Sequence, residues 1–220
     1  MPLSNHRCEV IVQNKNGVSD FDALKSAIRW RPQSLIFCAF DLLHLNGKDL
    51  RERPLLERRA KLKDLVPSEH PFLFSEEFTG DAEAFFQACA DHQLEGIVSK
   101  LASSRYRSGR SKTWLKTKCF TETSFVIIGT ARDRKTKAPL ALLAQAEPQG
   151  LRYAGSAFIT LSGIERAELS ARLQMSKLER CPIPKLHFPD AQWVNPQLMA
   201  RVRHLAGSKY LRHGTVRAID

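Results

Sequence analysis

The sequence predicts an α+β protein with two regions of different texture. In the first 120 residues, extended apolar runs alternate with amphipathic helical patterns. After that point, short strand patterns dominate and one helical pattern interrupts them. Apolar residues make up 43% and charged residues 26% of the 220-residue chain, which is typical of a globular protein. We expect a first domain at 1–120, with antiparallel sheets and helices, and a second, strand-rich domain at 121–220.

Strand and helix signals follow one another through the first region. A strand is expected at 8–13, and Ser19 is expected to cap the helix that follows, with Asp22 in the capping-box position. The nearly all-apolar run 34–45 predicts a long central strand that is buried on both faces. Turn and capping signals then introduce the remaining elements of this region: Asn46-Gly47, Pro54, Pro71 and Asp81.

The second region reads mainly as short strands. A helix is expected from Ser162 to about Leu178, and a single strand pattern covers 191–205. The other strand patterns lie at 125–130, 138–146, 151–158 and 210–219. Several short strands with one inserted helix predict a small β-barrel of the oligonucleotide-binding (OB) type.

A predicted hairpin near the middle of the chain carries the strongest chemical pattern. Strand patterns at 95–101 and 112–118 flank a loop rich in arginine. Alternate side chains share one face of a strand, so Lys116 and Lys118 are expected to point the same way and to converge on one phosphate. Glu95 adds a carboxylate suited to a metal-bound phosphate ester. The alternative is a hairpin whose charged face is merely solvated.

Positive charge gathers around this hairpin. The chain carries a net charge of +11, and segment 100–137 holds eleven basic and two acidic residues. Such a footprint is typical of proteins that bind a phosphate backbone, although a basic surface that serves only solubility is the alternative. The five cysteines show no CxxC pair and the seven histidines show no metal-ligand spacing. No apolar run is long enough to cross a bilayer and no signal peptide is present, so we expect no membrane association.

Three stretches resemble one enzyme family. EGIVSK at 95–100 and SKTWLKTK at 111–118 resemble the fourth and fifth motifs of the ATP-dependent DNA ligases, and the spelling is most similar to the bacterial end-joining type. FDLLHLNGKDLRERPLLERR at 40–59 resembles the third motif. The resemblance implies a partial nucleotidyltransferase (adenylation) domain followed by an OB-fold barrel. It also implies ATP (AMP) and Mg²⁺ as cofactors and nicked or broken double-stranded DNA as substrate.

The resemblance also assigns roles to single residues. It places Phe40 against the adenine ring and Glu9, in CEVIV, on the ribose. It places Glu95 at the metal and the nucleotide, and Lys116 and Lys118 on the α-phosphate. For Phe40 the alternative is core packing, and for Glu9 it is an exposed strand edge. The basic residues between and beside these motifs are the expected DNA contacts: Arg105, Arg107, Arg110 and Lys112.

The chain departs from the family pattern at three points. No K-x-D-G motif, which carries the lysine that accepts AMP, occurs in the 220 residues. Cys8 stands where the family usually has glycine, and 211–220 resembles only the start of the sixth motif, without its R-x-D-K element. We therefore expect a truncated ligase that forms no covalent AMP adduct alone, and that is degenerate or needs a separate N-terminal ligase fragment.

Other classes of function remain open at this level. A non-catalytic module that binds nicked DNA would use the same basic loop and barrel, and an RNA ligase or capping-type relative would use the same motifs. A bacterial end-joining ligase would act on nucleoid DNA in the cytoplasm, and a Ku-like end-binding protein would be a suitable partner.

Overall fold

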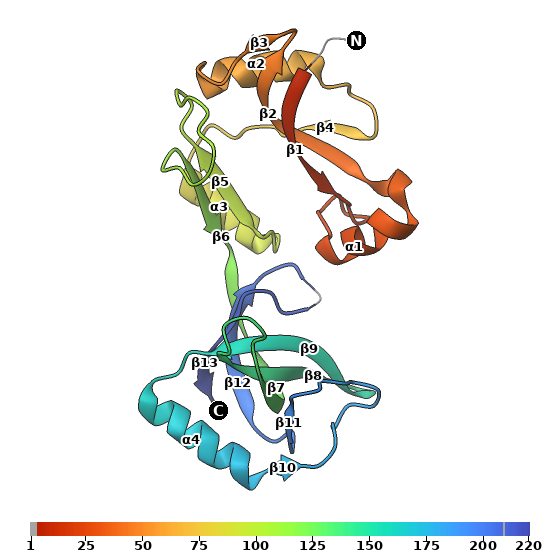
Figure 1. The fold of residues 1–220 in the computed structure, drawn as a ribbon, viewed down its shortest axis with the longest axis vertical. Helices are drawn as coiled ribbons and strands as arrows, with labels where there is room; N and C mark the ends of the chain where they lie inside the picture. The colour runs from red at the N-terminus through yellow and green to blue at the C-terminus, as the bar shows by residue number, and fades with distance from the viewer. Residues whose placement is uncertain (1–3, 209) are drawn as a thin grey trace. The chain divides into compact units, whose positions relative to one another are not determined.

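The computed structural model describes residues 4–208 and 210–220 and forms two compact units, Met1–Cys119 and Phe120–Asp220 (Figure 1). Each unit has its own sheets and its own buried core. The units are described separately below.

A four-stranded sheet organises the first unit. Its central strand β2 (Ile36–Leu45) pairs along its whole length with the antiparallel strand β1 (Ser4–Ile11). The short strand β3 (Lys48–Asp49) pairs antiparallel with the end of β2, and β4 (Phe72–Phe74) pairs parallel with its start. The predicted strands at 8–13 and 34–45 therefore exist, although β1 begins earlier, at Ser4.

Two bulges in β2 change which of its residues are buried. Phe40 and Leu43 have no Cα partner in β1, and the register shifts at both points. As a result Ala39, Leu42 and Leu45, spaced by three residues instead of two, enter one apolar cluster with Leu62. A bulge re-aims side chains in this way and bends the strand.

The prediction that β2 is buried on both faces is wrong. Within β2 only Ala39, Asp41 and Leu42 are buried, and Phe37 is 36% exposed. The prediction failed because the apolar composition of the run gives no sign of the bulges, which interrupt the two-residue alternation of faces.

Four short helices complete this unit: α1 (Phe21–Trp30), the 3₁₀ turn η1 (Pro32–Ser34), α2 (Leu55–Leu65) and α3 (Ala82–Asp91). The N-cap of α1 is Asp20, whose carboxylate accepts a hydrogen bond from the Ala23 amide at 2.8 Å, so the prediction of Ser19 was wrong by one residue. The prediction of Asp81 as the cap of α3 is confirmed, because its carboxylate accepts from the Glu83 amide at 2.9 Å.

A separate two-stranded hairpin, β5 (Gly96–Lys100) and β6 (Trp114–Lys118), also belongs to the first unit. Helix α3 packs against β5 (Figure 1). Both strands lie inside the predicted strand patterns, and the arginine-rich segment forms the connecting loop.

The second unit is built from seven strands: β7 (Phe120–Arg132), β8 (Pro139–Glu147), β9 (Gly150–Ile159), β10 (Lys177–Leu178), β11 (Gln192–Val194), β12 (Met199–Leu205) and β13 (Gly214–Ile219). Five of them form a closed circuit of pairings that runs β7, β8, β9, β13, β12 and back to β7. All of these pairs are antiparallel except β9 with β13.

One helix, α4 (Gly163–Met175), covers part of this circuit (Figure 1). Ser162 caps it in a capping box with Glu165, as its predicted start requires. Its buried residues Leu169 and Leu173 join the inner core with Ile127, Leu143 and Val202. The helix ends earlier than predicted because 177–178 form β10 instead, and the single strand expected at 191–205 is divided into β11 and β12.

Candidate functional site

One face of the β5–β6 hairpin gathers three lysines and a tryptophan. In the hairpin register Lys100 lies opposite Trp114, and Lys116 lies opposite Val98. Lys118 lies opposite Gly96. Because alternate residues of paired strands share a face, Lys100, Trp114, Lys116 and Lys118 belong to the same face.

Gly96 allows the two strands of the hairpin to approach closely. Its φ of 147° is a conformation that side-chain-bearing residues rarely adopt. A Cβ atom at this position would overlap the carbonyl oxygen of Thr117. The backbone of Thr117 and Lys118 therefore makes the close approach at this glycine.

Aromatic rings surround the ammonium group of Lys100. The Lys100 Nζ lies 4.8 Å from the centroid of the Phe40 ring and 4.5 Å from that of Trp114. The two rings meet edge to face with their centroids 6.0 Å apart. A cation within about 6 Å of a ring centroid is attracted by the ring's negative face. Phe40 is the bulged residue of β2, so the bulge positions this ring toward the hairpin.

A second cation completes the cluster from β1. The guanidinium carbon of Arg7 lies 5.5 Å from the Phe40 centroid, 5.4 Å from that of Tyr106 and 5.7 Å from that of Trp114. We refer to Arg7, Phe40, Lys100, Tyr106 and Trp114 as the aromatic–cation cluster. It joins β1, β2, the hairpin and the arginine-rich loop, and it presents flat rings beside positive charge.

The environment of Lys100 favours its neutral form. Burial lowers the pKa of its ammonium from 10.5 to about 8, and the positive charge of Arg59 adds to the effect. The carboxylates of Asp41 and Glu9 act in the opposite direction. A phosphate brought to this site would favour the charged form, since an opposite charge stabilises an ammonium.

The structure places the predicted nucleotide residues on neighbouring elements of the first unit. Phe40 belongs to the cluster, and Lys116 and Lys118 extend the hairpin face that Lys100 and Trp114 begin. Glu9 is exposed on β1 opposite Cys38, and its charge acts on Lys100.

Glu95 lies at the end of the hairpin where Lys118 is paired. It is exposed, and its backbone carbonyl accepts a hydrogen bond from the Cys119 amide at 2.9 Å. Among the described residues, no group of three or more His, Cys, Asp or Glu side chains could hold a metal ion. Mg²⁺ is usually held by one or two carboxylates together with substrate phosphates. An exposed carboxylate beside Lys116 and Lys118, the pair predicted to bind a phosphate, suits that mode of binding.

Glu52 is paired with two of the arginines that are predicted to contact DNA. Arg105 and Arg107 each donate a hydrogen bond to Glu52, over 3.0 and 2.9 Å respectively. The hydrogen bond from Arg107 is the largest cause of the lowered pKa of the Glu52 carboxyl. Arg110 and Lys112, the other two predicted contacts, are exposed.

A buried ion pair fastens this loop to the sheet. Arg58 on α2 donates from Nε to Asp41 Oδ1 over 2.8 Å and from Nη2 to Asp41 Oδ2 over 3.0 Å. Its Nη1 also donates to the carbonyl oxygen of Ser104, in the loop, over 3.2 Å. Neither side chain of the ion pair is exposed to solvent. Arg58 thus links β2, α2 and the loop through one guanidinium.

Next to it, Arg59 supports the backbone at the bulge. It donates to the carbonyl oxygens of Phe40 over 3.0 Å and of Ser75 over 2.6 Å. It also donates to the carboxylate of Glu77 over 3.1 Å. The two adjacent arginines therefore hold the segment of β2 at Phe40 and Asp41.

Sequence reasoning missed four members of the aromatic–cation cluster: Arg7, Lys100, Tyr106 and Trp114. A signal for two of them was present, because the alternation that links Lys118 to Lys116 continues to Trp114, and Lys100 ends the paired strand. No comparable local pattern indicates Arg7 or Tyr106, which arrive from β1 and from the loop.

The comparison with known families rests on the same region. The family model described as "ATP dependent DNA ligase domain" matches residues 7–118, just over half of the 220-residue chain. The chain belongs to the ATP-dependent DNA ligase family. The matched residues contain β1 from Arg7 onward, β2, the hairpin and the whole aromatic–cation cluster.

Curated relatives extend the similarity to most of this ligase-family chain. The multifunctional non-homologous end joining protein LigD of Pseudomonas aeruginosa is 30% identical over 221 aligned residues, which cover 95% of this chain and 26% of that protein. The SPbeta prophage-derived DNA ligase-like protein LigB of Bacillus subtilis is 35% identical over 132 residues, or 58% of this chain and 48% of that protein. The chain thus spans about a quarter of the length of the LigD relatives it matches.

Solved structures give the same family. The ligase domain of Mycobacterium tuberculosis LigD has a TM-score of 0.52 at 27% identity, covering 100% of this chain and 73% of that one. Mycobacterial DNA ligase D, solved as a complex with ATP and MES, has a TM-score of 0.53 at 28% identity with the same coverage.

Among the described residues, no helix is both long and apolar enough to cross a membrane.

Proposed function

We propose that this chain is the part of an ATP-dependent DNA ligase that holds the AMP moiety and a DNA break during end joining. The observation that carries the proposal is that Trp114 and three lysines share one face of the β5–β6 hairpin, and that Phe40 of β2 contacts this face at Trp114 and Lys100. Aromatic rings suit a nucleobase, paired lysines suit a phosphate, and family membership supplies the reaction class.

In this proposal each side chain acts on one part of the adenylated substrate. The ring of Phe40 stacks on adenine, and the carboxylate of Glu9 accepts hydrogen bonds from the ribose hydroxyls. Lys116 and Lys118 neutralise the α-phosphate. Glu95 is the carboxylate that would hold Mg²⁺, which supplies further charge neutralisation when it is bound. Placing fixed positive charge where negative charge develops is usually the largest contribution to such chemistry.

The reaction itself is the joining of two DNA ends. AMP is first transferred to the 5′-phosphate at the break from the lysyl-AMP of a polypeptide that carries the nucleophilic lysine. An oxygen of the 5′-phosphate bonds to the phosphorus of AMP, the P–N bond to the lysine breaks, and a DNA adenylate forms. The 3′-hydroxyl then attacks that 5′-phosphate, a phosphodiester bond forms, and AMP leaves with the electrons of the broken anhydride bond. The residues on the hairpin serve both steps by positioning and charge stabilisation.

Self-adenylation is a different matter, because it needs a covalent acceptor. The 220 residues contain no K-x-D-G motif. Lys116 is a poor substitute, since it would have to leave the phosphate that it neutralises. We propose that this chain alone forms no lysyl-AMP and acts on DNA that is already adenylated, or together with a polypeptide that supplies the lysine.

For the two units we propose the domain assignment 1–120, a partial adenylation domain, and 121–220, an OB-fold domain that binds DNA. The closed strand circuit of the second unit supports this assignment. We infer a five-stranded Greek-key barrel from two further features: a parallel pair between the third and fifth of the five strands, and a helix after the third.

Two incubations test the proposal. The chain is mixed with α-labelled ATP and Mg²⁺ and run on a denaturing gel, and separately with nicked DNA that already carries 5′-AMP. We expect no labelled protein and slow sealing of the pre-adenylated nick that is lost in Lys116→Ala. A labelled band that disappears when one lysine is changed would refute the absence of self-adenylation. No sealing by a folded sample that binds the nick would refute the catalytic role.

A second candidate is a non-catalytic module that holds nicked or broken DNA without sealing it. The missing K-x-D-G motif favours it. Binding to nicked DNA that weakens steeply with salt, without any sealing of the pre-adenylated nick, would support this candidate over a ligase half. A comparison of affinities for nicked DNA and RNA hairpins separates both from an RNA ligase.

For either candidate we propose a role in bacterial end joining. The suitable partner is a Ku-like protein that binds DNA ends, and the setting is the nucleoid DNA of the cytoplasm.

A further inference from the structure

Lys100 is a half-buried cation whose close partners are aromatic rings. Its Nζ lies 4.8 Å from the centroid of the Phe40 ring and 4.5 Å from that of Trp114, so it contacts both rings. Within residues 4–208 and 210–220, the ion pairs include none made by Lys100. The two rings therefore compensate part of the cost of burying this charge, because a cation–π contact gains strength where water is excluded.

The surroundings of the Lys100 ammonium are those of the core. The charges of Arg59 and Asp41 both act on it, and these two side chains are 5% and 0% exposed. Phe40, in contrast, is only half-buried, so part of its ring is accessible to a ligand. We therefore expect a base to stack on the accessible part of the Phe40 ring, with the ammonium on the side of the core.

A cation held against an aromatic ring changes what the ring binds. The ammonium attracts the electron density of the ring, so the rest of the ring becomes less negative. A neutral purine stacks well on such a ring, whereas a cationic base loses the attraction that a ring normally offers to a cation. Arg7 adds to the positive potential, because its guanidinium carbon lies 5.5 Å from the same centroid.

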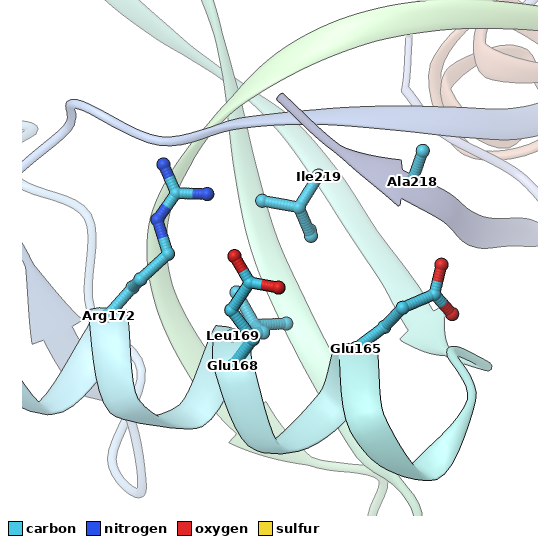
Figure 2. A pocket seen from close by; sticks show the side chains of 6 residues that line it. All are labelled: Glu165, Glu168, Leu169, Arg172, Ala218 and Ile219. Carbon is cyan, nitrogen blue, oxygen red and sulfur yellow. The ribbon is translucent and has the colours of Figure 1, made fainter.

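The hollow beside helix α4 in the second unit offers no comparable surface for a base. It has a volume of about 160 Å³ and is lined by Glu165, Glu168, Leu169, Arg172, Ala218 and Ile219, none of which is aromatic. Figure 2 shows both glutamate side chains and Arg172 extending from the helix. Two carboxylates beside one guanidinium also disfavour a nucleotide phosphate. The aromatic–cation cluster, which combines rings with cations, is the better place for a nucleotide base.

We propose that Lys100 is a positioning residue that sets base specificity: it holds and polarises the Phe40 ring, and so favours a neutral purine over a cationic one. This role rests on the proposed stacking of adenine on Phe40. It differs from the role of Lys116 and Lys118, which lie about 7 and 13 Å further along the strand from Trp114. Lys100 is thus at the base end of the hairpin face, and the other two lysines are at the phosphate end.

Binding of AMP and of N1-methylated AMP to the full chain tests this role. The methylated base is cationic at neutral pH, so the two ligands differ in the charge of the base and share the sugar and the phosphate. Titration calorimetry at pH 7 without added metal measures both affinities. We expect Lys100→Met to lose about threefold in AMP affinity. Its preference for AMP over the methylated ligand should narrow about fivefold or more, because the variant removes a like charge that repels the cationic base.

Two further variants calibrate this result. Lys100→Arg keeps a cation at the rings and should keep both the AMP affinity and the preference close to those of the wild type. Lys25→Met makes the same chemical change at another lysine of the first unit, whose Nζ lies 4.7 Å from the centroid of the Phe21 ring on α1. This control should leave both affinities unchanged. Circular dichroism shows whether each variant is folded.

The pH dependence of AMP binding gives a second measurement. Wild-type affinity should fall about threefold between pH 7 and pH 9, because the Lys100 ammonium loses its proton through its lowered pKa of about 8. In Lys100→Arg the fall should be absent, since a guanidinium stays charged throughout. The other charged or titratable groups near Lys100 remain in that variant: Arg7, Glu9, Cys38, Asp41, Arg59, Tyr106 and Lys116. A fall that persists in Lys100→Arg would therefore exclude Lys100 as its source.

The outcomes separate this role from the proposed function. If Lys100→Met weakens both ligands equally and leaves the preference unchanged, Lys100 is merely structural and the inference is overturned, while AMP binding by the wild type leaves the ligase proposal standing. If the wild type binds no AMP, the proposed adenine site is wrong and the role of Lys100 falls with it. Should Lys100→Met not fold, the comparison of the wild type with Lys100→Arg across pH decides alone.

Discussion

Arg58 and Asp41 form a bidentate ion pair in which both side chains are fully buried, with an Nε to Oδ1 distance of 2.8 Å. The remaining donor of Arg58 reaches carbonyl oxygens of Arg53 and Ser104. The pair therefore ties the central strand to the segment before α2 and to the arginine-rich loop. Inside the core of the first unit, the pair thus couples buried charge to the position of the loop.

Removing one partner of this pair should destabilise the first unit strongly. Arg58→Met leaves the Asp41 carboxylate buried without its charge partner, which typically costs about 3–5 kcal/mol. Urea unfolding followed by fluorescence measures the loss. The double variant Asp41→Leu/Arg58→Met removes both charges and should be clearly more stable than Arg58→Met. Equal stability of the single and double variants would contradict this account of the pair.

Phe40 should contribute to nucleotide affinity through its ring. Stacking of a base on an aromatic side chain is worth about 1–3 kcal/mol, so Phe40→Ala should weaken ATP binding about tenfold or more. Phe40→Tyr keeps the ring and should bind almost as the wild type does. Titration calorimetry measures both.

Phe37 provides a matched control on the same strand. It is 36% exposed, and its ring contacts Phe72 with a centroid distance of 6.1 Å, away from the aromatic–cation cluster. Phe37→Ala should leave ATP affinity unchanged. If the two alanine variants lose the same affinity, the stacking role of Phe40 is wrong and the effect lies in the strand.

Lys100 should make stability depend on pH in the alkaline range. Its pKa is lowered from 10.5 to about 8, chiefly by burial, so between these values the unfolded chain binds more protons than the folded one. Stability contributed by this group therefore rises as pH increases from about 8 to about 10.5.

The variant Lys100→Met tests this directly, because it removes the titrating group and keeps the length of the side chain. The free energy of unfolding is measured by urea at pH 7.5 and at pH 10. The free energy of unfolding of the wild type, relative to that of Lys100→Met, should rise between pH 7.5 and pH 10, because only the wild type carries the titrating ammonium. A pH-independent difference would show that the folded state does not disfavour the charged ammonium.

Glu52 should restrain DNA binding by the arginine-rich loop. Its carboxylate holds Arg105 and Arg107, and a DNA phosphate must displace it. Glu52→Gln should tighten binding to nicked DNA about threefold and steepen the salt dependence, because two more cations are available to release counterions.

Glu57→Gln is the matched control for Glu52. It makes the same charge change at an exposed position of α2 that has no ion pair among the described residues. Anisotropy at several salt concentrations compares the two variants. Tighter binding in both to the same degree would assign the effect to net charge and not to release of the arginines.

Several elements of this protein follow from local sequence, because their signals span only a few residues. The hairpin strands, the capping residues Asp81 and Ser162 and the alternation that puts Lys116 and Lys118 on one face need no knowledge of distant parts of the chain. Local signals fail where two capping candidates are adjacent, as at Ser19 and Asp20, or where a strand contains bulges, as β2 does.

Only the tertiary structure decided which side chains meet. The aromatic–cation cluster joins Arg7 of β1 to Phe40, Tyr106 and Trp114, and Glu52 meets Arg107 across 55 residues of sequence. These contacts depend on strand register and on bulges, which local residue patterns do not specify because partners far apart in sequence set them. The sequence by itself therefore determined the charged hairpin and its likeness to DNA ligases, whereas the packing of β1, β2 and the loop decided what surrounds it.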